Sequence, residues 1–145
     1  MIDRSVIGTE SEPGVNEVEK GAIRRFAEAL EDENPLWRSE AAARAAGYRG
    51  LVAPPTFPTS FRAGSDVRVH LDVGDRPILQ AEEVYQYERP LVAGDVVILT
   101  ERITDVQARS GPGGRMDLVT IEGEGVDPDG EVLYRSRRLL IVRDP

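Results

Sequence analysis

The stretch DVVILTERITDVQARSGPGGRMDLVTIEGEGVDPDGEVLYRSRRLLIVR, residues 95–143, decides the fold. It contains three runs rich in apolar and β-branched residues, 95–109, 115–126 and 131–143, and each run is typical of a β-strand. The tetrapeptides GPGG (111–114) and DPDG (127–130) separate the runs, and their residues favour tight turns. Long strands joined by short turns predict an antiparallel meander.

A fourth strand is predicted at residues 79–89, which include Val84, Tyr85 and Tyr87. The chain before residue 78 has helical signals instead. Helices followed by strands indicate an α+β fold, in which a sheet packs on helix. Neither an internal repeat nor a low-complexity segment divides the 145 residues, so one domain spanning 1–145 is expected.

Three helices are predicted in this first half. The segment NEVE (16–19) resembles a capping box in which Asn16 caps the first helix, and Asn34-Pro35 is expected to end that helix. Its apolar residues recur at helical spacing: Ala22, Ile23, Phe26, Ala27 and Leu30.

The second predicted helix covers residues 40–46, with Ser39 as its cap and Gly47 as its stop. The third covers 57–63, with Thr56 as its cap, and would bury Phe57 and Phe61. Residues 64–77 are rich in glycine and aspartate and are predicted to form a loop.

Composition and charge exclude several classes of function. With 18 basic and 26 acidic residues, the net charge of −8 disfavours binding to nucleic acid or to an anionic membrane. The absence of cysteine excludes a disulfide framework and thiolate metal sites, and neither a metal nor a cofactor is expected. Glu10 and Glu12 lie early and no long apolar run follows, so a cytoplasmic chain without signal peptide or membrane span is expected.

Three motifs follow one another in the chain: DENPLW (32–37), GYRGLVAPPTF (47–57) and YERPLVAGD (87–95). Together and in this order they resemble the MaoC-like (R)-specific enoyl-thioester hydratases and 3-hydroxyacyl-ACP dehydratases. The resemblance is greater to the branch called FAS1-like dehydratase, or MaoC N-terminal domain. It spans roughly residues 5–143, nearly the whole chain.

The resemblance implies a hot-dog fold, a curved antiparallel sheet wrapped around a central helix. Here the helix near residues 56–63 is expected to lie against a sheet built from residues 79–143. Two such domains usually pair edge to edge, so the implied partner is a second copy or a catalytic MaoC-like subunit. The implied ligand is an acyl-CoA or acyl-ACP thioester in a tunnel at the interface. The family's reaction is the reversible addition of water across a trans-2-enoyl thioester.

Active members carry Asp-x-Asn-Pro-x-His, whose Asp and His hold the attacking water as a general acid/base pair. Carried over by position, the catalytic set is Asp32, Asn34 and, in place of the histidine, Trp37. Indole is a hydrogen-bond donor only and cannot exchange that proton at neutral pH. The sole histidine of the chain, His70, is interpreted as a surface residue of the predicted loop.

The second motif departs from the family as well. Active members have His-Gly at the start of the next helix, where the glycine N–H stabilises the thioester oxygen. The matching residues here are Ala53 and Pro54, and proline has no N–H. The N–H groups of Thr56 or Phe57 are the candidate substitutes. The resemblance therefore assigns the substrate contacts to Gly50, Ala53, Thr56 and Phe57.

Structural explanations compete with each functional one. Asp32 and Asn34 also suit a helix stop and turn, and Trp37 also suits a core or interface position. Arg89 is a candidate for a salt bridge across a dimer. The arginines 135, 137 and 138 are interpreted as a solvated strand face, with the phosphates of CoA as the alternative partner.

Three functions remain open from the sequence. The leading hypothesis is a non-catalytic subunit that pairs with a catalytic MaoC-like chain and helps bind an enoyl thioester. The second is an active homodimeric hydratase that uses Asp32 or Glu33 as a lone acid/base, since one buried carboxylate with a raised pKa can transfer protons. The third is a dimer that binds acyl-CoA without turnover.

Overall fold

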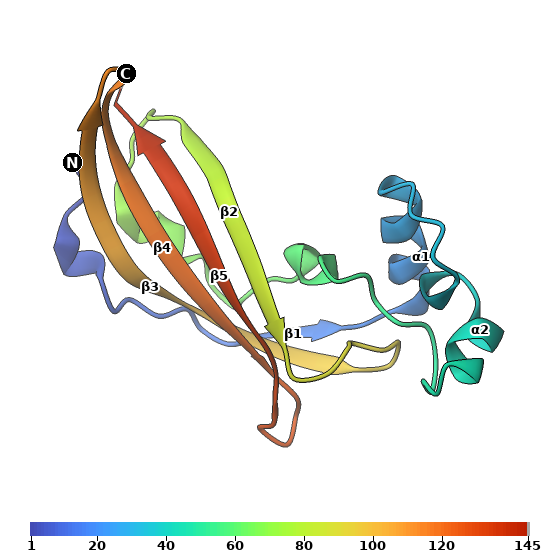
Figure 1. The fold of residues 1–145 in the computed structure, drawn as a ribbon. Helices are drawn as coiled ribbons and strands as arrows, with labels where there is room; N and C mark the ends of the chain where they lie inside the picture. The colour runs from blue at the N-terminus through green and yellow to red at the C-terminus, as the bar shows by residue number, and fades with distance from the viewer. Residues whose placement is uncertain (145) are drawn as a thin grey trace.

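A computed structural model describes residues 1–144. Its main feature is a curved five-stranded antiparallel sheet with the strand order β1-β3-β4-β5-β2 (Figure 1). The strands are β1 (Gly14–Glu17), β2 (Ile78–Tyr87), β3 (Val96–Gly111), β4 (Gly114–Val126) and β5 (Val132–Arg143). The four predicted strands are confirmed to within two residues at each end, whereas β1 was not predicted.

The predicted meander is formed by β3, β4 and β5. Gly111 pairs with Gly114 across the first turn, and Gly114 has a φ of 99°, a conformation that favours glycine. Strand β2 then pairs with the outer side of β5. The register shifts between Ile103 and Asp105 and between Gln80 and Glu82, and such bulges bend and twist a sheet.

The start of the first helix differs from the prediction. Helix α1 (Lys20–Ala29) begins after Glu19, which makes no side-chain capping bond. Asn16 is not its cap, because this residue belongs to β1 and pairs with Val97. The side chain of Asn16 instead accepts a hydrogen bond from the Arg62 N–H and donates one to the Arg62 carbonyl, both at 2.9 Å. Strand pairing has overridden the local capping pattern.

The predicted end of the first helix is also wrong. Helix α1 stops at Ala29, and Glu31 has a φ of 54°, which a right-handed helix cannot contain. The chain therefore leaves the helix before it reaches Asn34-Pro35. The second helix is confirmed as α2 (Glu40–Ala45), where the Ser39 hydroxyl accepts from the Ala42 N–H at 3.1 Å.

The predicted third helix is wrong. Residues Phe57–Ser60 form one 3-10 turn, η3, and the Thr56 side chain makes no capping bond. The backbone is extended at Phe61, whose ring lies against Phe57 (5.5 Å between centroids) and Tyr134 (6.4 Å). Packing on the sheet thus outweighs local helix propensity. The predicted loop contains a further 3-10 segment, η4 (Val67–Leu71), with both end residues buried.

The buried side chains form two hydrophobic clusters. The first cluster lies where α1, η3 and the second and third motifs meet the sheet, and its members are Val18, Ile23, Ala27, Trp37, Leu51, Val52, Ala53, Phe57, Leu91, Val97, Leu99, Leu133 and Tyr134. The second cluster joins the N-terminus and η4 to the sheet, and its members are Ile2, Val67, Leu71, Ile103, Val106, Val119, Ile121, Leu140 and Val142. Helices α1 and α2 lie together at the first-cluster end of the sheet (Figure 1).

Gly125 leaves room for a large ring in the first cluster. A Cβ atom at this position would lie 2.4 Å from the Cε1 atom of Tyr134. We expect Gly125→Ala to lower the free energy of unfolding by about 1–3 kcal/mol, because an overpacked core must shift. Urea denaturation measures the change. Gly111→Ala is the matched control, since a Cβ there meets nothing within 4 Å, and an equal loss in both variants would contradict the prediction.

Candidate functional site

The three sequence motifs lie side by side in the structure. The Val52 N–H of the second motif donates to the Leu36 carbonyl of the first at 3.0 Å. The Ala53 N–H donates to the Leu91 carbonyl of the third at 2.8 Å. The second motif therefore holds the other two together, and the three motifs form one region.

Asp95, the residue directly before β3, links the second and third motifs to the sheet. Its carboxylate is 3% exposed and accepts hydrogen bonds from Arg89 (2.7 and 3.1 Å), from the Val92 N–H (2.8 Å) and from Arg49. Burial alone would raise the pKa of Asp95, but the Arg89 and Val92 hydrogen bonds and the two arginine charges outweigh it and lower the pKa. Arg89, a candidate for a cross-dimer salt bridge, is thus paired within its own chain.

Asp32 and Asn34 act as turn residues. The Asp32 Oδ1 atom accepts from the Asn34 N–H at 3.0 Å, and the Asn34 Oδ1 atom accepts from the Leu36 N–H at 3.0 Å. The second bond caps the 3-10 turn η2 (Pro35–Trp37). Asp32 is half-buried and Glu33 is exposed. The turn considered for Asp32 and Asn34 is therefore present, whereas the helix stop is not, because α1 ends at Ala29.

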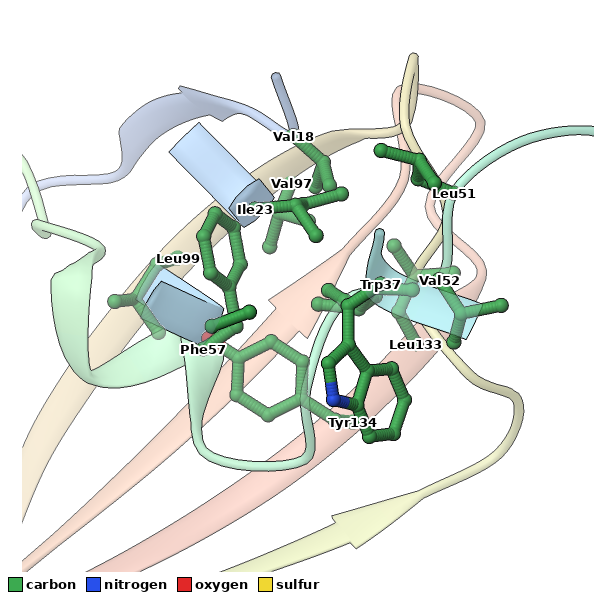
Figure 2. Packing of buried hydrophobic residues seen from close by; sticks show 13 residues of the cluster. Val18, Ile23, Trp37, Leu51, Val52, Phe57, Val97, Leu99, Leu133 and Tyr134 are labelled. Atoms are coloured by element: carbon green, nitrogen blue, oxygen red, sulfur yellow. The ribbon is translucent and has the colours of Figure 1, made fainter. Parts of the chain in front are cut away.

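Trp37 is a member of the first cluster, together with Val52, Leu133 and Tyr134 (Figure 2). Only 9% of its surface is exposed. Its indole Nε1–H is buried and has no hydrogen-bond partner within residues 1–144. The core position considered for Trp37 is confirmed.

Few backbone N–H groups remain free where an oxyanion would be bound. The Ala53 N–H donates to Leu91 and the Phe57 N–H donates to the Pro54 carbonyl at 2.9 Å. Prolines 54 and 55 have no N–H. Among residues 53–57, the N–H of Thr56 is therefore the one that takes part in neither bond, and Thr56 is exposed.

The predicted substrate-contact residues do not all face the same space. Ala53 and Phe57 are buried in the first cluster with Trp37, whereas Thr56 is exposed. Gly50 instead borders a broad hollow of about 640 Å³, which Lys20 and Arg49 also line. The structure thus separates Gly50 from the other three residues.

Three tyrosines form an aromatic group on the inner face of the sheet. The ring centroids of Tyr85, Tyr87 and Tyr134 lie 5.8–6.3 Å apart. The Tyr87 hydroxyl donates to the Pro55 carbonyl at 2.5 Å, and the Tyr85 hydroxyl donates to Glu83 at 2.6 Å. Burial raises the pKa of all three phenols above the ordinary value of a tyrosine. The sequence placed Tyr85 and Tyr87 in a predicted strand but did not single out Tyr134.

His70 lies elsewhere. It is exposed on η4, whose buried residues Val67 and Leu71 belong to the second cluster, so it does not replace the missing histidine beside Asp32. Within residues 1–144 no group of three or more histidine or carboxylate side chains is placed to hold a metal ion. Over the same residues, no helix has the length and apolar character needed to cross a membrane.

Comparison with known proteins identifies the family of the chain. A family model described as "FAS1-like, dehydratase domain region" matches residues 5–135. A UPF0336 protein of Thermobifida fusca (strain YX) is 36% identical over 149 residues, which cover 98% of this chain and 94% of the relative.

Solved structures agree with the fold. The C-terminally truncated HadBC (3R-hydroxyacyl-ACP dehydratase) complex of Mycobacterium tuberculosis contains a chain with a TM-score of 0.76 and 27% identity, over 94% of this chain and 96% of that one. A MaoC-like dehydratase matches with a TM-score of 0.83 and 27% identity, over 96% of this chain but 42% of its own longer chain. The α+β hot-dog fold predicted from the motifs is confirmed by these likenesses.

Proposed function

Since the chain belongs to the family of FAS1-like dehydratase regions, with MaoC-like dehydratases as structural neighbours, we propose that it is the substrate-binding, non-catalytic subunit of a paired enoyl-CoA or enoyl-ACP hydratase. The burial of Trp37 at the family's histidine position carries this proposal. An indole packed among apolar side chains neither takes nor gives the proton that hydration requires.

The surroundings of Asp32 support the same conclusion. In an active member, a water molecule is held between the aspartate and the histidine and is deprotonated there. In this chain the Asp32 carboxylate accepts from the Asn34 N–H, and the partner position holds Trp37 in the first cluster. One carboxylate at a turn lacks the second group that would orient the water.

The thioester oxygen also lacks its usual support. Pro54 stands at the position of the donating glycine, and the neighbouring Ala53 and Phe57 N–H groups already donate to backbone carbonyls. An oxyanion site works through donors that are free and aimed before the reaction begins. We therefore assign stabilisation of the thioester oxygen to the partner subunit.

The proposed partner is a catalytic MaoC-like chain that carries Asp-x-Asn-Pro-x-His. The HadBC relative is described as a complex, which is the assembly that this proposal requires. Strand β2 is the outermost strand at one side of the sheet, and Ile78, Leu79 and Val84 on it are 39–49% exposed. An unpaired edge strand with exposed apolar side chains favours pairing with another chain. The cytoplasm is the proposed compartment of the pair.

The chain purified alone is expected to form a dimer through β2. Static light scattering at micromolar concentration should therefore give about twice the 15.9 kDa mass of the chain. Leu79→Glu on β2 is expected to shift the equilibrium to the monomer, because a charge would be buried at the interface. Val15→Glu is the matched control, since Val15 is 71% exposed on the opposite edge strand. A 15.9 kDa monomer of the unmodified chain would refute this prediction.

The decisive test of the proposed function is a hydratase assay on the pure chain and on its mixture with an intact-motif subunit. The proposal requires turnover to depend on the mixture. Turnover by the pure chain would favour the homodimeric hydratase that uses Asp32 or Glu33. Binding of acyl-CoA with no turnover in any mixture would favour the non-catalytic dimer.

A further inference from the structure

A charged cleft lies on the inner face of the sheet, between the two hydrophobic clusters. Alternate residues of a strand share one face. On β5, Tyr134, Arg138 and Leu140 share the inner face. Tyr134 belongs to the first cluster and Leu140 to the second, so Arg138 lies between the two clusters. On β3, Glu101 takes the same place between Leu99 and Ile103. The segment from Phe61 to Arg68 forms the opposite wall, and the cleft has a volume of about 280 Å³.

Arg138 is held in this cleft with one donor unused. Its guanidinium donates to Glu101, and the two side chains are 22% and 15% exposed. The Arg138 Nε–H is buried and has no hydrogen-bond partner among the residues that the structure describes. Leaving a buried charged donor unpaired is costly, so this N–H favours an acceptor from a bound molecule.

The charges of the cleft favour an anion. Arg68 is paired with Asp66 at 2.6 Å, as Arg138 is with Glu101. Arg62 also lines the cleft, so its lining residues include three arginines and two acidic residues. One carboxylate from a ligand would balance this charge.

We propose that this cleft binds the carboxylate group of a small organic acid. A carboxylate supplies the acceptor that the Arg138 Nε–H lacks, and its planar pair of oxygens matches the fork of a guanidinium. Arg68, at the mouth of the cleft and 47% exposed, adds a second positive charge. Neither residue belongs to the three motifs that define the thioester site.

The carboxylate has two possible sources, a free acid or the far end of an acyl chain. Arg138 lies four residues from Tyr134 along β5, about 13 Å at the usual rise of a strand. An acyl chain that starts near Trp37 and carries a terminal carboxylate would extend in this direction. This second source rests on the proposed function, whereas the free acid does not.

The test is a titration of the ¹⁵N-labelled full chain with sebacate, the free ten-carbon dicarboxylate, followed by nuclear magnetic resonance of the arginine Nε–H signals. The Arg138 signal is identified by its loss in Arg138→Met. We expect it to shift and saturate. Arg138→Met and Arg68→Gln should each weaken sebacate binding about tenfold or more, as is usual for a lost charge-assisted hydrogen bond.

Arg137→Gln is the matched control, because Arg137 is the neighbour of Arg138 on the opposite face of β5 and pairs with Glu82 at 3.0 Å. It should bind sebacate as the unmodified chain does. Absence of a saturable shift, or equal affinity in all three variants, would overturn the proposal. If Arg138→Met fails to fold, Arg68→Gln against Arg137→Gln decides alone.

Two thioesters distinguish the sources. If the carboxylate is the end of an acyl chain, Arg138→Met weakens the binding of sebacyl-CoA about tenfold or more and leaves decanoyl-CoA unchanged. If the source is a free acid, the variant affects sebacate and neither thioester. Sebacate binding in a chain that binds no acyl-CoA supports the cleft and contradicts the proposed function instead.

Discussion

The pure chain is expected to hydrate crotonyl-CoA and longer trans-2-enoyl-CoAs slowly or not at all, and to gain turnover when mixed with a catalytic MaoC-like subunit. A positioned acid/base contributes about 10²–10⁴-fold to such a reaction, and one oxyanion donor about 10²–10³-fold. Trp37 removes a member of the acid/base pair, and Pro54 removes the donor. Together the two losses cancel most of the acceleration. The loss of the ultraviolet absorbance of the conjugated enoyl thioester measures the rate.

Single repairs are expected to fail in this assay. Trp37→His restores the histidine, but Pro54 still lacks an N–H, and the smaller ring leaves a cavity beside Val52 and Leu133.

The unmodified chain is expected to bind acyl-CoA although it lacks the catalytic groups, since the walls of the site do not depend on a histidine at position 37 or a glycine at position 54. Trp37 is the only tryptophan, so quenching of its fluorescence follows binding.

Asp32→Asn is the control to use if the pure chain does hydrate enoyl-CoA. Substantial steady-state hydration by the pure chain, abolished by this substitution, would contradict the proposed non-catalytic role. It would identify Asp32 as a lone acid/base in a homodimeric hydratase. Hydration that persists in Asp32→Asn would identify a contaminating enzyme.

Asp95→Ala is expected to lower the free energy of unfolding by about 1–3 kcal/mol, the usual cost of losing hydrogen bonds to a buried charged group whose two arginine partners are partly exposed. The substitution leaves Arg89, Arg49 and the Val92 N–H without their shared acceptor. It also loosens the turn through which the third motif joins β3. Urea denaturation measures the loss, and Asp75→Ala, at an exposed aspartate, should change stability by less than about 0.5 kcal/mol.

The effect of Asp95 should depend on pH. The pKa of this carboxyl is lowered in the folded chain, so the folded state binds its proton less readily than the unfolded state does. The stabilisation is then fully present above the unfolded pKa of about 3.9 and is lost as the pH falls through the lower, folded pKa. The stability difference between the unmodified chain and Asp95→Asn should therefore shrink below about pH 4. A constant difference down to pH 2 would contradict this assignment.

The sequence by itself determined the strands of the meander, helix α2 and the family. These features depend on neighbouring residues: the alternation along 115–126, the turn residues DPDG and the Ser39 cap all act within a few positions. The sequence also showed that Trp37 stands where the family's pattern Asp-x-Asn-Pro-x-His has its histidine.

Only the tertiary structure decided the features that depend on distant residues. Asn16 resembles a cap, but its pairing with Val97 makes it part of β1. Residues 57–63 resemble a helix, but the Phe61 ring packs on Tyr134 and the backbone extends. The orphaned N–H of Trp37 and the partners of Asp95 likewise appear only after folding. Long-range packing and pairing supply free energies larger than local propensities, which amount to less than about 1 kcal/mol per residue, and so they decide wherever the two disagree.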